Sequence, residues 1–232
     1  MKKNRTLCPG PSGQETIAGF GYMAFQFLFF PSLLFWCNGK LSHPLNDAEL
    51  NFLFYLLNFL AVLLIFHDFL GKSIRQVMEH PAYFCQAVIL GLAAYYACRI
   101  CTVFVISRLS PDYQNYNDAA IASMESGSFF LTGLSTVILA PPVEECYFRG
   151  LIFRNLHSRS PWAAYLVSMA AFALVHILGY IEIYSPLNLT LAVLEYLPAG
   201  LCLAWAYGKG GTIAAPIVVH ALINFASIRT LR

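Results

Sequence analysis

The feature that most constrains this chain is the recurrence of apolar stretches about twenty residues long, separated by short polar segments. A helix needs about 20 apolar residues to cross a hydrocarbon core of ~30 Å. Because backbone inside lipid must satisfy its own hydrogen bonds, such stretches are predicted to be helices. The sequence therefore predicts an all-α, polytopic transmembrane helix bundle of about seven spans, at roughly 17–37, 49–70, 84–107, 128–148, 161–181, 186–207 and 211–228.

Composition supports a membrane location. Charged residues make up 11% of the 232 residues, whereas soluble domains carry about 25%. The chain has too few charges to cover a water-exposed surface, so a soluble enzyme is a poor interpretation and a lipid bilayer is the expected surrounding. The formal net charge of +2 is too small to indicate a nucleic-acid partner.

Along the chain we expect a polar N-terminal segment, 1–16, then N-terminal spans without recognised motifs, 17–127, and then a motif-bearing core, 128–232. Lys and Arg are more numerous in the segments that would lie inside if the N-terminus is cytoplasmic. This bias predicts an N-inside orientation.

The first motif of the core is a glutamate doublet, Glu144-Glu145, that follows Pro141-Pro142. The proline pair predicts a break in the span and a new helix start. Glu145 and Arg149 are four residues apart, so they share a helix face and are expected to pair. Glu144 points about 100° away, free for another task. The alternative is a solvated, interfacial Glu-Glu-Arg cluster.

Two further spans carry polar residues. His176 lies in the fifth span, and His220 and Asn224 lie on one face of the seventh. Each alone is also explained by packing or by an interhelical hydrogen bond. Together with the doublet, they supply a base, an acid partner, an orienting cation and hydrogen-bond donors for an oxyanion. That set suits attack of water on a carbonyl.

These motifs resemble those of a known family. Glu144-Glu145-x-x-x-Arg149, Phe172-x-x-x-His176 and His220-x-x-x-Asn224 are similar, in order and spacing, to the three signature motifs of the CPBP family. This group comprises membrane endopeptidases like CAAX prenyl protease 2 and the bacteriocin-processing proteins, also called the Abi family.

The resemblance, which covers roughly 128–228, implies an intramembrane endopeptidase that acts on a membrane-anchored protein or peptide. In this interpretation Glu144 activates water and His176 shares the proton transfer. His220 and Asn224 stabilise the oxyanion, and Glu145 with Arg149 holds the first motif in place. The substrates that fit are prenylated CAAX tails, leader peptides and C-terminal sorting tails. A small enzyme acting on sorting tails would suit a bacterial inner membrane.

No cofactor is required by this mechanism. A zinc alternative stays open, because His176, His220 and Glu144 would make a His₂Glu ligand set with a free fourth position. The pattern HExxH of many zinc proteases is absent from the sequence.

Two alternatives come from other classes. A cysteine protease of the exosortase type would use Cys146, Arg149 and His176, but it would leave the glutamate doublet without a role. A transporter or non-catalytic scaffold would use Arg99 and Glu195, which are otherwise expected either to pair with each other or to extend to the membrane interface.

Overall fold

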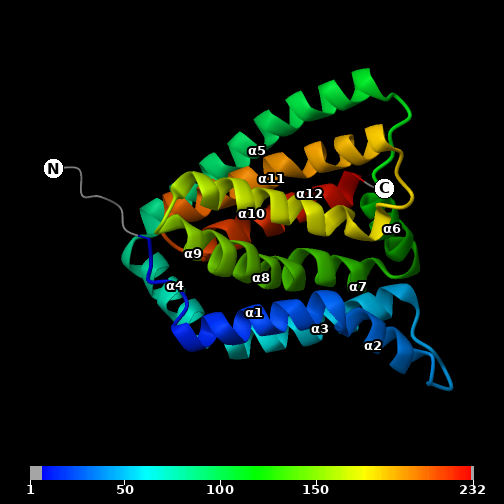
Figure 1. Ribbon diagram of the computed structural model, residues 1–232, viewed down its shortest axis with the longest axis horizontal. Coiled ribbons are helices and arrows are strands. Elements are labelled where there is room, and N and C mark those ends of the chain that lie inside the picture. Colours follow the sequence, from blue (N-terminus) through cyan, green and yellow to red (C-terminus); the bar gives the residue numbers. More distant parts are fainter. Residues whose placement is uncertain (1–6, 231–232) are drawn as a thin grey trace.

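The computed structural model describes residues 7–230, and this range contains helices and no strand (Figure 1). Most long helices run side by side across the view in Figure 1, with α4 at one end of the bundle and α6 at the other. The predicted all-α bundle is therefore confirmed. The α-helices are α1 (Gly13–Leu28), α2 (Phe30–Asn38), α3 (Asp47–Ile65), α4 (His67–Glu79), α5 (Pro81–Leu109), α6 (Tyr116–Gly127), α7 (Phe129–Gly133), α8 (Ala140–Glu145), α9 (Arg154–His157), α10 (Pro161–Ile177), α11 (Pro186–Gly210) and α12 (Ala214–Thr230).

The predicted number of spans is not confirmed by the lengths of the helices. Among residues 7–230, the helices long and apolar enough to cross a membrane are α3, α5, α11, and α10 extended by a 3₁₀ turn to Tyr180. α1 and α2 add a fifth span if the pair, bent by 49°, is counted as one. The figure of seven is not confirmed, because α12 has only 17 residues and the predicted span 128–148 is divided among shorter helical segments.

The outside of the bundle is apolar. Trp162 is 82% exposed, Leu64 80% and Phe35 73%, and many other large hydrophobic side chains are exposed with them. Such a surface is costly in water and favourable among lipid chains. Together with the apolar helices, it identifies the chain as an integral membrane protein.

The glutamate doublet lies inside a continuous helical run, residues 129–157, and not at a helix start. The run contains two π-helical stretches, Leu134–Leu139 before the proline pair and Cys146–Phe153 after the doublet. A proline ring clashes with the carbonyl four residues earlier in an α-helix. The wider π turn, which bonds five residues back, lets the run continue through Pro141 and Pro142. The prediction of a break at the proline pair is therefore wrong.

α11 holds the C-terminal part of the bundle together, because it packs against α5, α10 and α12. The contact with α10 is close at Gly200, where a Cβ atom would lie 3.0 Å from backbone atoms of Met169. α12 also packs against α8 and the first π-helical stretch. The second and third motifs are thereby brought beside the first.

Candidate active site

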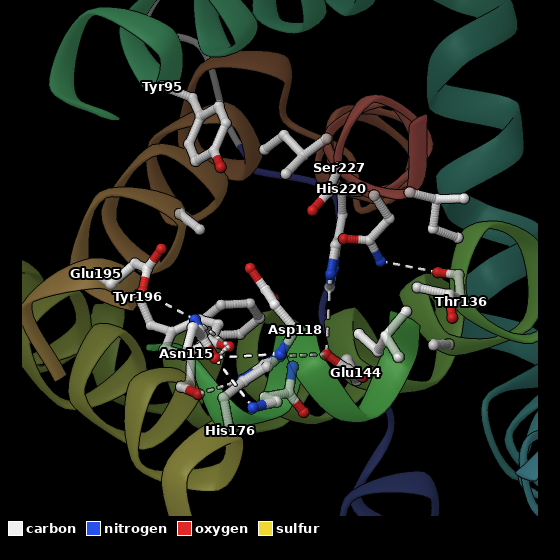
Figure 2. Close-up of a pocket in the computed structure, with 18 of the residues that line it drawn as sticks. Tyr95, Asn115, Asp118, Thr136, Glu144, His176, Glu195, Tyr196, His220 and Ser227 are labelled. Atoms are coloured by element: carbon white, nitrogen blue, oxygen red, sulfur yellow. Dashed lines mark hydrogen bonds and ion pairs between the residues drawn. The ribbon is translucent and has the colours of Figure 1, made fainter. Parts of the chain in front are cut away.

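The motif residues come together at one cavity of about 170 Å³ inside the bundle (Figure 2). The cavity is lined by residues from three of the predicted motif segments and by others from α3, α5, α6 and α11. From the motifs, the lining residues are Glu144, Phe172, His176, His220 and Asn224.

Glu144 is turned toward the two imidazoles. Its side chain is 12% exposed, and its Oε2 atom lies 3.7 Å from His176 Nε2 and 3.9 Å from His220 Nε2. Oε2 is buried and accepts no hydrogen bond from residues 7–230. These separations are too long for direct hydrogen bonds and suit one water molecule bridging the groups.

Glu145 faces away from the cavity and is fully buried. Its Oε1 atom accepts a hydrogen bond from Arg149 Nη1 at 2.9 Å, so the pair predicted from the four-residue spacing is confirmed. The same oxygen lies 2.8 Å from His220 Nδ1. Arg149 Nη2 donates to the backbone oxygen of Gly200 at 2.9 Å. The pair thus connects the helical run, α11 and α12 behind the cavity.

The hydrogen bonds of the two histidines fix which ring nitrogen faces Glu144. His176 Nδ1 lies 2.8 Å from the Phe172 carbonyl oxygen, which can only accept, so Nδ1 carries the hydrogen. His220 Nδ1 donates to the carboxylate of Glu145 in the same way. Both Nε2 atoms are therefore left to face the cavity. The His176 ring also stacks on Tyr196, with centroids 4.5 Å apart.

Asn224 lies beside the same cavity. Its Nδ2 atom donates to the backbone oxygen of Thr136 at 2.8 Å, inside the first π-helical stretch. An amide NH₂ has two hydrogens, so one remains for another acceptor. The structure thus brings together all six residues singled out from the sequence, with four facing the cavity and the pair Glu145–Arg149 supporting them from behind.

Several cavity residues were missed by the sequence analysis, because they lie outside the motifs. Tyr55 on α3 donates its hydroxyl to Glu144 Oε1 at 3.3 Å. No sequence signal marks it, since aromatic residues are frequent in membrane spans. Asn115 and Asp118, at the start of α6, also line the cavity. They belong to residues 108–127, a polar segment rich in Tyr and Asn between two apolar stretches, and this composition is the one signal in the sequence.

The part of the cavity beside α6 and α11 has its own polar network. Glu195 accepts hydrogen bonds from Arg99 at 3.4 Å, Tyr113 at 3.0 Å and Asn115 at 2.8 Å. The predicted pairing of Arg99 with Glu195 is therefore confirmed. Nearby, burial raises the pKa of the Asp118 carboxyl to about 6, with Glu195 adding to the increase and Arg99 opposing it.

The cysteine alternative finds no support in the geometry. Cys146 is fully buried and packs in a hydrophobic cluster with Val62 and Phe66. It does not line the cavity that holds His176. A thiol in this position has no access to a peptide substrate in the cavity.

The zinc alternative requires three ligands arranged around one point. Within residues 7–230, no group of three or more His, Cys, Asp and Glu side chains has an arrangement that could hold a metal ion. The set His176, His220 and Glu144 therefore does not form a ready-made site here.

Comparison with known proteins agrees with the motifs. Residues 126–226 match the model of a family described as type II CAAX prenyl endopeptidase, Rce1-like. Searches of curated proteins and of solved structures found no match. The matched range holds all three motifs, and the family indicates an intramembrane protease with a membrane-anchored peptide substrate. Residues 126–226, which carry the three motifs, are therefore similar to the CAAX-protease-like membrane proteins of the CPBP family.

Proposed function

We propose that this protein is an intramembrane endopeptidase in which Glu144 activates water for hydrolysis of a peptide bond. The observation that carries the proposal is the position of Glu144 Oε2, which is buried, without a hydrogen-bond donor in residues 7–230, and close to two imidazole Nε2 atoms in a polar cavity. A water molecule bound between the Glu144 carboxylate and the two imidazoles would be both oriented and polarised by them.

The contact between His220 and Glu145 supports an oxyanion donor beside this base. His220 Nδ1 lies 2.8 Å from the buried Oε1 atom of Glu145, and Nε2 of the same ring faces the cavity. With hydrogen on both ring nitrogens, His220 would present Nε2–H to the cavity as a hydrogen-bond donor.

The proposed reaction begins with attack of water on the carbonyl carbon of the peptide bond. Water donates a hydrogen bond to Glu144 and its oxygen attacks the carbonyl carbon, while Glu144 takes the proton, with His176 beside it to share the transfer. The carbonyl oxygen becomes an oxyanion that accepts hydrogen bonds from His220 Nε2 and from the second amide hydrogen of Asn224. Glu144 then passes the proton to the leaving nitrogen as the C–N bond breaks, which yields a carboxylic acid and an amine.

The substrate that we propose is a membrane-associated protein or peptide cut near the membrane surface. A CAAX-like tail, a leader peptide and a C-terminal sorting tail all present an extended segment next to a membrane anchor. A bacterial inner membrane is the location we propose, which cell fractionation would test.

The decisive experiment compares Glu144→Gln with Glu182→Gln in proteoliposomes that contain membrane-tethered reporter peptides. Glu182 is exposed, in a turn outside the cavity, so its variant controls for the loss of one carboxylate. Because general base catalysis contributes about 10²–10⁴-fold, Glu144→Gln should lose that much activity and insert normally. A fully active Glu144→Gln protein would favour a scaffold or transporter.

The role of metal is tested on the same preparation. Cleavage that persists after exhaustive chelation supports the metal-free mechanism. Loss of cleavage on chelation, with recovery on addition of Zn²⁺, would instead support the ligand set His176, His220 and Glu144.

A further inference from the structure

We infer that Tyr55 is a positioning residue for the general base, and that the N-terminal half of the chain thereby contributes to the active site. The inference rests on the proposed function of Glu144. Tyr55 lies on α3, outside the range 126–226 that matches the family. Its hydroxyl donates to Glu144 Oε1, at 3.3 Å.

The two oxygens of Glu144 have different surroundings. Oε1 accepts the hydrogen bond from Tyr55, and Oε2 faces the two histidines. A glutamate side chain has three rotatable bonds, so a carboxylate with no fixed oxygen would sample several orientations. Anchoring Oε1 keeps Oε2 directed at the site where water would bind, which is the kind of preorganisation that catalysis requires.

The Tyr55 ring is itself held in place. α3 packs against α8 and against the π-helical stretch before it. The Tyr55 ring contacts Phe54 edge to face, with centroids 5.2 Å apart, and Phe54 stacks on Phe30 of α2 at 5.4 Å. The hydroxyl therefore belongs to a packed aromatic group that joins α2 and α3. Its position relative to Glu144 depends on the docking of these helices.

The chain offers a matched control in Tyr22. Its hydroxyl donates to Asn58 Oδ1 at 2.9 Å, between α1 and α3, and Tyr22 does not line the cavity. Tyr22→Phe and Tyr55→Phe each remove one hydroxyl whose hydrogen bond joins α3 to a neighbouring helix. They differ in whether the lost bond reaches the base.

The test measures kcat, KM and the pH profile of kcat/KM for both variants, in proteoliposomes with a membrane-tethered peptide. Tyr55→Phe should lower kcat about tenfold, as expected for loss of a hydrogen bond to a charged group, with KM within about twofold. The acid limb of the profile should move to higher pH, because the ionised carboxylate has lost a donor. Tyr22→Phe should change none of these quantities.

A double variant separates this inference from the proposed function. Because Tyr55 acts through Glu144, adding Tyr55→Phe to Glu144→Gln should cause no further loss. A Tyr55→Phe enzyme whose kcat and pH profile match those of Tyr22→Phe would overturn the inference, and so would a further loss in the double variant. Neither result bears on Glu144, whose role fails only if Glu144→Gln is active.

Discussion

Arg149 donates a hydrogen bond from Nη2 to the backbone oxygen of Gly200, 2.9 Å away and 51 residues later in the sequence. Through Nη1 the same guanidinium holds Glu145. One planar group therefore fixes the distance between the helix of the glutamate doublet and α11. Since His220 bonds to Glu145 as well, the geometry of the cavity depends on the Arg149 guanidinium.

Replacement of Arg149 by Met should destabilise the protein strongly. It leaves the buried Glu145 carboxylate without its cation, and breaking a buried pair costs about 3–5 kcal/mol. Arg149→Lys should retain only part of the lost stability, because an ammonium group does not reproduce the planar guanidinium that bonds to both Glu145 and Gly200. Thermal unfolding in detergent would measure both effects. Arg159→Met, at an exposed position, is the control, and an equal effect there would contradict the prediction.

Gly200→Ala should separate α10 from α11. The new Cβ would lie 3.0 Å from the Cα and carbonyl oxygen of Met169, and backbone cannot move aside without shifting a helix. Overpacking of this kind costs about 1–3 kcal/mol, and activity should fall because Gly200 also accepts the Arg149 hydrogen bond. The comparison is Gly133→Ala, where no atom lies within 4 Å of the new Cβ. That variant should be neutral or slightly stabilising, and equal effects at both glycines would count against this account.

Asp118 should make stability depend on pH. α6 is not among the membrane-spanning helices, and burial beside Glu195 raises the pKa of Asp118 from 3.8 to about 6. Between these values the folded state binds more protons than the unfolded state, so stability falls as pH rises from about 4 to about 6 and stays lower above. Ionisation of Asp118 lowers the free energy of unfolding by at most about 3 kcal/mol, and by less where water enters the cavity.

Asp118→Asn removes the titration at this position. The variant should unfold at a higher temperature than the parent at pH 8, and the difference should shrink at pH 5 and vanish near pH 4. Asp112→Asn, in the exposed turn before α6, should show no such trend. A stability difference between Asp118→Asn and the parent that is the same at pH 5 and pH 8 would refute the assignment.

Cys146→Ala should leave catalysis intact. The thiol is buried among hydrophobic side chains outside the cavity, so its removal creates a small void and costs on the order of 1 kcal/mol. We expect kcat within about twofold of the parent in the peptide assay. Loss of turnover in a well-folded Cys146→Ala protein would reopen the cysteine mechanism.

Local spacing was enough to predict several contacts. Glu145 and Arg149 lie four residues apart and form the expected pair, because helical geometry alone brings them together. Arg99 and Glu195 were predicted to pair because isolated charges in a membrane span need partners. The separation of Glu144 from Glu145 around the helix also followed from the helical period. These features depend on short-range geometry or on the cost of unpaired charge.

Other features depend on packing between distant segments. The π-helical stretch before the proline pair packs against α3 and α12, and the one after the glutamate doublet packs against α1 and α10. No residue pattern specifies either stretch. Tyr55 is one aromatic residue in an apolar helix, so nothing in the sequence separates it from its neighbours. The predicted number of spans is not confirmed, because apolar content alone does not reveal the bends and breaks that divide the helices.

The contact between Tyr55 and Glu144 has a consequence for biogenesis. α3 emerges from the ribosome well before α8, and the two must meet before the carboxylate is correctly oriented. A chain in which these two helices have not yet docked would hold the Glu144 carboxylate without the Tyr55 hydrogen bond. On the proposed mechanism, turnover would stay low until they dock.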